Sequence, residues 1–209
     1  MKDLQNKLID LKIQLTNFQK FQLSIKYLLD KIFAILLFIL LLPVFLIISL
    51  LIILEDGYPV FFVQDRVGLN GKIFKMYKFR SFKKNADLSN IYTYSNDPRI
   101  SKVGKFIRRF SIDELPQLLN IIKGDMSFIG PRPNLPFQYQ TLNDIQRQRY
   151  LVKPGITGLA QINGRNKLKW EERIYYDLIY IKNYNLLLDL YILYKTFFIV
   201  ISGEGVYER

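Results

Sequence analysis

Hydrophobic residues are concentrated in one long run near the N-terminus. Residues 32–54 contain no charged side chain, and Ser49 is their one polar residue. A helix of this length can cross about 30 Å of hydrocarbon, so residues 23–54 are predicted to be membrane-inserted. Before the run, apolar residues such as Leu15 and Phe18 recur near helical spacing among lysines and glutamines. We expect residues 1–22 to form an amphipathic extension on a surface or partner, or a solvated helix.

Two features indicate that the membrane segment turns back. Lysines and arginines lie on both sides of the run, and such flanks favour the cytoplasmic face at both ends. Pro43 lies in the middle of the run, where a proline removes a backbone hydrogen bond and bends a helix. A re-entrant hairpin satisfies both features, and a kinked spanning helix remains the alternative. A cleaved signal peptide is not expected, because the run is too long and no small-residue cleavage site follows.

Residues 55–209 mix short β-prone and helical segments, which predicts one cytosolic domain of the α+β class, mainly helical. Residues 60–64 and 73–80 bracket an Asn-Gly pair, which predicts a β-hairpin. Lys78 and Arg80 would share one face of its second strand. That face either lines an anion site or protects a strand edge. Residues 83–100 are polar and turn-rich and are expected to form a loop.

An acidic pair lies where a helix is expected to begin. Ser111 and Glu114 have the spacing of a capping box, although Pro116 could delay the start of the regular helix. Either start places Asp113 and Glu114 at a helix N-terminus beside Arg108, where carboxylates stay ionised. Ordinary capping residues would show the same local pattern.

The C-terminal third is rich in aromatic residues. A helical face of tryptophan and tyrosines spans residues 170–184, and the apolar residues 186–202 include Asp189 and Lys195. Tryptophan and tyrosine favour the head-group region of membranes. The sequence therefore predicts interfacial or buried amphipathic helices in preference to a second spanning helix, with core packing as an equal explanation of the aromatic face.

The composition limits which residue types could carry catalysis and which partners the protein could bind. The chain has 30 Lys+Arg against 18 Asp+Glu, a net charge of +12, no histidine and no cysteine. The charge implies an anionic partner such as nucleic acid, lipid head groups or phosphorylated small molecules. Without histidine and cysteine, catalysis would fall to carboxylate, hydroxyl, lysine or a bound metal. The pair Asp113 and Glu114 is therefore the first candidate for chemistry.

Two further motifs suit phosphate binding. In residues 123–133, Arg132 lies between two prolines on a turn entered by glycine, and a rigid guanidinium binds phosphate well. Residues 153–166 combine glycines with Gln161, Asn163 and Arg165, as a nucleotide-binding loop would. Neither a Walker A nor a G-x-G-x-x-G pattern is present, which disfavours a standard ATP or dinucleotide fold.

Three ordered motifs carry a family resemblance. They are FKMYKFRSF, RRFSIDELPQLLNIIKGDMSFIGPRP and KPGITGLAQINGRN, and they follow the N-terminal hydrophobic hairpin. Together, over roughly residues 25–200, the chain resembles the bacterial sugar transferases, which are monotopic phosphoglycosyl transferases that start glycan assembly. The resemblance implies transfer of a sugar-1-phosphate from a UDP-sugar to a membrane polyprenyl (undecaprenyl) phosphate, with release of UMP. It also implies a location at the cytoplasmic face of the bacterial inner membrane.

The resemblance assigns roles by position. Asp113 would be the nucleophile of a covalent phosphosugar intermediate and a ligand of Mg²⁺, with Glu114 as its catalytic partner. Asp177 is a matched acidic position whose role stays open. The family's Ser-Pro pair at the membrane bend is Leu42 and Pro43 here, so no serine hydroxyl supports the bend. Phosphate oxygens would be held by Lys78, Arg108 and Arg132.

A function of another class stays open. A membrane-anchored protein without catalysis could hold nucleic acid or acidic lipid on its basic surface, with the aromatics of residues 74–84 stacking on bases. No recognised nucleic-acid motif appears, and the acidic pair would then have no purpose, so the sequence favours a transferase without a nucleic-acid partner. The sugar, the pathway, homo-oligomer formation and the role of residues 1–22 stay open.

Overall fold

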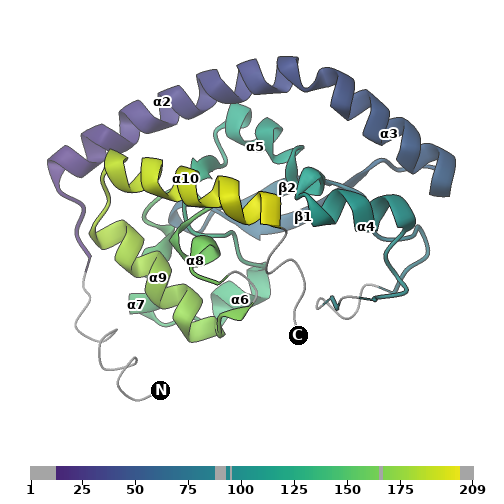
Figure 1. The fold of residues 1–209 in the computed structure, drawn as a ribbon. Coiled ribbons are helices and arrows are strands. Elements are labelled where there is room, and N and C mark those ends of the chain that lie inside the picture. The colour runs from purple at the N-terminus through teal and green to yellow at the C-terminus, as the bar shows by residue number, and fades with distance from the viewer. Residues whose placement is uncertain (1–12, 88–92, 95, 165–166, 203–209) are drawn as a thin grey trace.

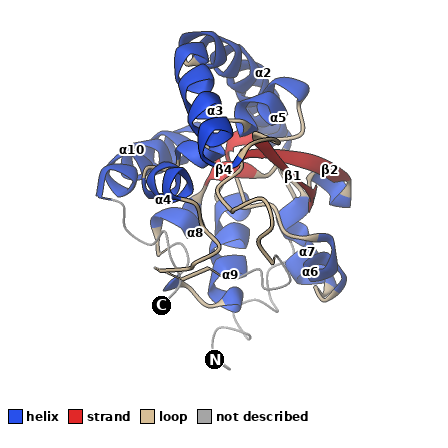
Figure 2. Cartoon of the chain, turned by 90° about the vertical axis from the view of Figure 1, so that its right-hand side faces the viewer, coloured by secondary structure: helices blue, strands red, loops and turns tan. Residues whose placement is uncertain are grey.

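The computed structural model describes residues 13–87, 93–94, 96–164 and 167–202. Helices predominate, and the described strands form two two-stranded sheets, β1-β2 and β3-β4. The mainly helical α+β class is confirmed. Helices α2 (Asn17–Leu40) and α3 (Leu42–Asp56) form a bent arch along one side of the molecule, and α9 (Trp170–Lys182) lies on the opposite side (Figures 1 and 2).

The predicted bend at Pro43 is present. The axes of α2 and α3 differ by 61°, and Pro43 lies in the first turn of α3, where its missing N–H has no helical partner to lose. Among the described residues, each helix alone fails a test of length and apolarity for crossing a membrane, and this bent pair passes it jointly.

The amphipathic extension is described only in part. Residues 1–12 lie outside the described residues, and residues 13–16 are not helical. Helix α2 begins at Asn17 because Thr16 caps it: the Thr16 Oγ1 accepts from the Gln19 backbone N–H at 3.1 Å, and the Gln19 side chain accepts from the Thr16 N–H at 3.0 Å.

The predicted β-hairpin is confirmed. Strands β1 (Phe61–Val67) and β2 (Ile73–Phe79) pair antiparallel. Asn70 and Gly71 connect them with φ of 54° and 77°, a conformation that asparagine and glycine adopt at least cost. The described part of residues 83–99 contains turns and irregular chain, as expected of a loop.

The start of the helix after the acidic pair differs from the capping prediction. Ser111 lies at the N-cap position of the short turn that follows, but it has a left-handed φ of 56° and makes no capping hydrogen bond with its side chain, so the predicted capping box is wrong. Asp113 and Glu114 instead lie in a short 3-10 turn, η2 (Ile112–Glu114). The regular helix α5 (Gln117–Lys123) begins only after Pro116, the later start that the proline suggested.

The two segments predicted to bind phosphate, residues 123–133 and 153–166, pack against each other. A Cβ at Gly155 would lie 2.1 Å from the backbone nitrogen of Gly130, so only glycine permits this close approach. The remaining elements are α4 (Lys102–Arg109), β3 (Ser127–Ile129), α6 (Pro136–Gln140), α7 (Asp144–Arg147), η3 (Gln148–Tyr150), β4 (Gly155–Thr157), α8 (Leu159–Ile162) and α10 (Leu186–Ser202), and β3 pairs parallel with β4.

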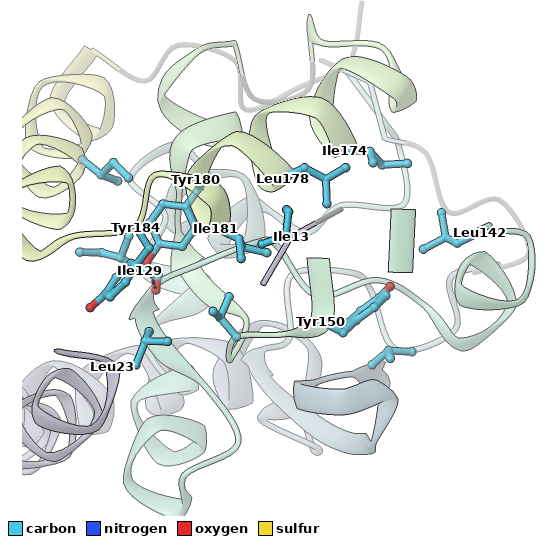
Figure 3. Packing of buried hydrophobic residues seen from close by; sticks show 13 residues of the cluster. Ile13, Leu23, Ile129, Leu142, Tyr150, Ile174, Leu178, Tyr180, Ile181 and Tyr184 are labelled. Atoms are coloured by element: carbon cyan, nitrogen blue, oxygen red, sulfur yellow. Dashed lines mark hydrogen bonds between the residues drawn. The ribbon is translucent and has the colours of Figure 1, made fainter. Parts of the chain in front are cut away.

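The main core lies between α9, α10 and the small parallel sheet. Tyr180 and Tyr184 are 1% and 2% exposed in it (Figure 3), so core packing explains this part of the aromatic face. Asp189 of α10 accepts from the Tyr180 hydroxyl at 2.8 Å and pairs with Lys26 of α2 at 3.0 Å. The opposite face of α10 exposes Leu190, Phe197 and other large apolar side chains, as an interfacial helix would.

Candidate active site

A cavity of about 560 Å³ lies beside the acidic pair. Its walls come from segments that are distant in sequence, because the hairpin, η2, the Pro-Arg-Pro turn and α8 converge there. The charged residues that line it are Arg66, Lys78, Arg80, Arg108, Asp113, Glu114, Arg132, Arg149, Arg173 and Asp177. A ligand in this cavity would therefore meet many more cations than acids.

Glu114 is fully engaged by two cations. Its Oε1 accepts from Lys78 Nζ at 2.8 Å and from Arg132 Nη2 at 2.6 Å, and its Oε2 accepts from Arg132 Nη1 at 3.4 Å. Burial would raise the pKa of Glu114, but the charges and hydrogen bonds of Arg132 and Lys78 outweigh burial and hold the pKa well below its usual range. Glu114 is therefore an ionised clamp between the two cations.

Asp113 has the opposite environment. Only 9% of it is exposed, and within the described parts of the chain no hydrogen bond or ion pair reaches its carboxylate. Burial raises the pKa of Asp113, the positive charge of Lys78 opposes this shift, and the negative charge of Glu114 adds to it. Asp113 thus presents an uncommitted carboxylate to the cavity, which is what a nucleophile or a metal ligand needs.

Arg132 is positioned through its backbone by a buried ion pair. Arg149 donates through Nη2 to the Arg132 carbonyl oxygen at 3.0 Å and pairs with Asp177 at 2.5 Å. Burial raises the pKa of Asp177 to about 6, although Arg149 pulls it down. The sequence-predicted Asp177 therefore reaches the cavity as the partner of a residue that supports the phosphate-binding turn.

Arg108 reaches the cavity from the end of α4. Its Nη2 donates to Thr93 Oγ1 at 2.7 Å, and its guanidinium lies 5.4 Å from the centre of the Phe82 ring. The loop after the hairpin therefore holds this guanidinium at the cavity through a hydroxyl and an aromatic ring.

The other four predicted ligand residues have different outcomes. Gln161 lines the cavity, and both its side-chain amide atoms are buried without a partner among the described residues. Arg80 lines it too, but its Nη2 donates to the Asp56 and Gly57 carbonyls at 3.0 and 2.6 Å, which ties it to the end of α3. Asn163 follows α8 as its C-cap, is exposed, donates to the Leu159 carbonyl of that helix and does not line the cavity. Arg165 lies outside the described residues.

Two arginines that line the cavity, the half-buried Arg66 and the buried Arg149, were missed by the sequence reasoning. Arg66 donates to the Pro133 carbonyl at 3.0 Å, and burial together with the charge of Arg132 lowers its pKa to about 10. Arg149 is 3% exposed, and its Nε and Nη1 have no partner among the described residues. Neither arginine belongs to a short motif, so only the tertiary structure reveals them.

Few side chains among the described residues could coordinate a metal ion at the cavity. No group of three or more acidic side chains that could hold a metal ion occurs among the described residues. Asp113 nevertheless offers an unpaired carboxylate in the cavity, and Mg²⁺ commonly takes one or two carboxylates and completes its shell with phosphates and water. Asp113 therefore fits Mg²⁺ that arrives with a phosphorylated substrate.

Comparisons with known proteins identify the family of the chain. The family model for bacterial sugar transferases matches residues 21–203. The chain is 47% identical over 155 residues to the uncharacterized sugar transferase EpsL of Bacillus subtilis, over 74% of this chain and 76% of that protein. It is 41% identical over 169 residues to the undecaprenyl-phosphate galactose phosphotransferase of Salmonella typhimurium, over 73% of this chain and 36% of that protein.

A third relative is the UDP-glucose:undecaprenyl-phosphate glucose-1-phosphate transferase of Escherichia coli. The chain is 42% identical to it over 187 residues, which are 85% of this chain and 40% of that protein. The chain thus spans less than half the length of the Salmonella and Escherichia relatives. The fold, the site and these matches define an enzyme of the transferase class. The chain belongs to the bacterial sugar transferase family, as its motifs predicted.

Proposed function

We propose that this protein transfers a sugar-1-phosphate from a UDP-sugar to a polyprenyl (undecaprenyl) phosphate, giving polyprenyl-diphosphate-sugar and UMP. The observation that carries the proposal is the uncommitted carboxylate of Asp113 in a cavity ringed by cations. The relatives from Salmonella and Escherichia support it, because their names state undecaprenyl-phosphate sugar-phosphate transfer.

The reaction proceeds in two displacements. An Asp113 oxygen attacks the β-phosphorus of the donor, the bond from that phosphorus to the bridging oxygen breaks, and UMP leaves with the electron pair. An oxygen of the polyprenyl phosphate then attacks the phosphorus of the aspartyl adduct, and cleavage of the acyl–phosphate bond restores the carboxylate. One nucleophile can thus serve a soluble donor and a lipid acceptor in turn.

Asp113 and Glu114 have different roles in the proposed reaction. A carboxylate approaches a phosphate only where the negative charge is offset. Lys78 and Arg132 are held by Glu114 at the edge of the cavity, and Arg108 and Arg66 line the same space. Glu114 cannot easily attack, since both its oxygens are occupied, so it serves by fixing two phosphate-binding cations.

Mg²⁺ is the expected cofactor. Asp113 would give it one oxygen and keep the other for attack, and the diphosphate would provide further ligands. When bound, the ion would neutralise charge on the transferred phosphate. A titration of bound Mg²⁺ in the presence of UDP, with wild-type protein and Asp113→Asn protein, tests this assignment. Equal affinity in both proteins would contradict it.

We further propose that α2 and α3 form a re-entrant hairpin in the bacterial inner membrane, with the remaining domain on the cytoplasmic face. The bend of 61° and the exposed apolar side chains of both helices support this location. The chain lacks cysteine, so Lys20→Cys and Tyr58→Cys, on either side of residues 23–54, each provide a unique label site. An impermeant thiol reagent should reach both from the cytoplasmic side only, and labelling from opposite sides would contradict the hairpin.

The reaction itself is tested by UMP release. Purified protein with Mg²⁺ and a short polyprenyl phosphate should release UMP with at least one member of a UDP-sugar panel, and that member identifies the sugar. Donor radiolabelled in the sugar should label the protein when the acceptor is omitted, and the label should map to Asp113. Full turnover without any such adduct would contradict the covalent step, whereas a protein that only binds nucleic acid or lipid would release no UMP.

A further inference from the structure

Two buried side chains on the cavity wall have hydrogen-bonding groups without a partner. Gln161 of α8 is 9% exposed, and neither its Oε1 nor its Nε2 has a partner among the described residues. Arg149 of η3 is 3% exposed, and its Nε and Nη1 likewise lack a partner there. Both residues line the cavity. Buried polar groups in proteins are nearly always paired, so a ligand in the cavity is expected to pair with these atoms.

Both side chains lie close to the segment that carries the Pro-Arg-Pro turn. Arg149 donates through Nη2 to the Arg132 carbonyl oxygen at 3.0 Å. A Cβ at Gly158 would lie 2.2 Å from the Gly130 carbonyl oxygen and 3.0 Å from Gln161 Oε1, so this amide lies near the start of the segment. The two side chains thus approach the same short segment at positions two residues apart, and one ligand can contact both.

The charge of Arg149 is already balanced. Its partner is Asp177 at 2.5 Å, and both side chains are 2% exposed. Glu114, by contrast, is shared by two cations, Lys78 and Arg132. A diphosphate is therefore expected at these two cations, because one carboxylate balances only one of them. The unpartnered donors of Arg149 are better suited to an uncharged acceptor such as a carbonyl group.

The uracil base of a UDP-sugar has the groups that would satisfy these atoms. The edge of uracil presents one N–H group, at N3, between two carbonyl acceptors, O2 and O4. A primary amide can accept from N3–H and donate to the carbonyl beside it, because both uracil groups point the same way. We propose that Gln161 binds this edge and that Arg149 donates to the other carbonyl. The inference rests on the proposed function and names the side chains that recognise the nucleotide.

An aromatic ring completes this site. Trp170 of α9 lines the cavity, and the guanidinium of Arg149 lies 5.7 Å from its ring centre. Bases commonly stack on aromatic side chains while other side chains bind their edges. A sugar acetamido group matches Gln161 less well, because its N–H and C=O point in opposite directions. Sugar hydroxyls also pair with amides, so recognition of the sugar by Gln161 is the outcome that a test must exclude.

Methylation of N3 tests the inference without turnover. UDP, 3-methyl-UDP and pyrophosphate are titrated with Mg²⁺ by calorimetry into wild-type, Gln161→Leu and Asn163→Leu protein. Asn163 is the matched control, because it is an exposed amide that does not line the cavity. Wild-type and control protein should bind UDP at least about tenfold more tightly than 3-methyl-UDP, because the methyl group removes N3–H and occupies the place of the amide.

The Gln161→Leu protein should lose this preference. Its affinity for UDP should fall about tenfold, and its affinities for UDP and 3-methyl-UDP should differ by no more than about twofold, because the amide that distinguishes them is gone. Pyrophosphate should bind equally to all three proteins, since Lys78 and Arg132 are unchanged. Thermal unfolding verifies that each variant is folded.

The outcomes separate this inference from the proposed reaction. Equal binding of UDP and 3-methyl-UDP by wild-type protein would overturn the inference, even if the Gln161→Leu protein does not fold. Unchanged UDP affinity in folded Gln161→Leu protein would also overturn it, and a raised KM for the UDP-sugar alone would then assign Gln161 to the sugar. Loss of the preference in Gln161→Leu protein, together with no UMP release by wild-type protein, would support the inference and contradict the proposed reaction.

Discussion

Replacement of Asp113 by asparagine should separate the chemistry from the fold. The side chain keeps its shape but loses its charge. Burial raises the pKa of the Asp113 carboxylate, and the positive charge of Lys78 offsets burial only in part. The charged form is therefore less favourable in the folded protein than in the unfolded chain. We expect Asp113→Asn protein to have a higher thermal midpoint than wild type.

Turnover should change in the opposite direction. If Asp113 attacks the β-phosphorus, an amide cannot replace it, and the covalent route is lost. Loss of the nucleophile in other enzymes that form covalent intermediates lowers kcat by about 10⁴-fold to 10⁶-fold. We expect UMP release to fall by at least about 10⁴-fold, with binding of UDP to the protein retained because the cations around the cavity are unchanged.

The assay combines three measurements on one preparation. These are initial UMP release with saturating donor and acceptor, UDP binding by calorimetry, and thermal unfolding in the same detergent. Turnover within tenfold of wild type would refute the role of Asp113 as nucleophile. A thermal midpoint several degrees lower would refute the conclusion that its carboxylate lacks a stabilising partner.

Three further changes probe the surroundings of the site. Glu114→Gln should lower the free energy of unfolding by about 2 kcal/mol and reduce turnover strongly, because two cations lose their shared partner; unchanged thermal unfolding would contradict the clamp. Since the folded pKa of Asp177 is raised from 3.8 to about 6, its contribution to stability is full below about pH 4 and is lost as the pH rises through 6. The wild-type thermal midpoint should therefore fall more between pH 4.5 and 7.5 than that of Asp177→Asn protein, and parallel curves would count against this shift. Gly104→Ala should unfold several degrees lower, because its Cβ would lie 2.0 Å from the Ser81 carbonyl oxygen; an unchanged midpoint would show that α4 can move.

Features that depend on neighbouring residues could be predicted from the sequence. The hairpin follows from β-prone residues on both sides of Asn70 and Gly71, whose left-handed conformations set the turn. The bend at Pro43 follows from the missing N–H of one residue. The polar loop after the hairpin likewise needed only local composition. Each of these features is determined within a few residues, which is why a pattern was sufficient.

Features that depend on tertiary contacts could not be predicted. The capping pattern at Ser111 was wrong because the residue adopts a left-handed conformation at the junction of α4 and η2. The charge of Asp189, which interrupts an apolar helix, is explained only by Lys26, far away in the sequence. Arg149 carries no motif, and its role follows from simultaneous contacts with Asp177 and the backbone of Arg132.

The different environments of the two adjacent acids also depend on tertiary structure. In the sequence, Asp113 and Glu114 are equivalent carboxylates beside arginines. The short turn η2 directs the longer side chain toward Lys78 of the hairpin and Arg132 of the Pro-Arg-Pro turn, which occupy both its oxygens. The shorter side chain reaches neither cation within hydrogen-bonding distance. The extra methylene group of Glu114 and the geometry of η2 thus explain why Glu114 bridges two cations while Asp113 remains a candidate nucleophile.

The bent helix pair also supports the cations of the site. Before the bend, Leu37 of α2 lines the cavity, and Leu41 lines it at the junction with α3. After it, α3 packs Phe45 against Phe79, the residue that follows Lys78 on β2, and shares a core cluster with Ile107, which precedes Arg108. Phe38 of α2 packs against the same cluster, so both helices contact it across the bend. The proline that bends the apolar run therefore lets one continuous segment line the cavity and support two of the cations that would hold phosphate.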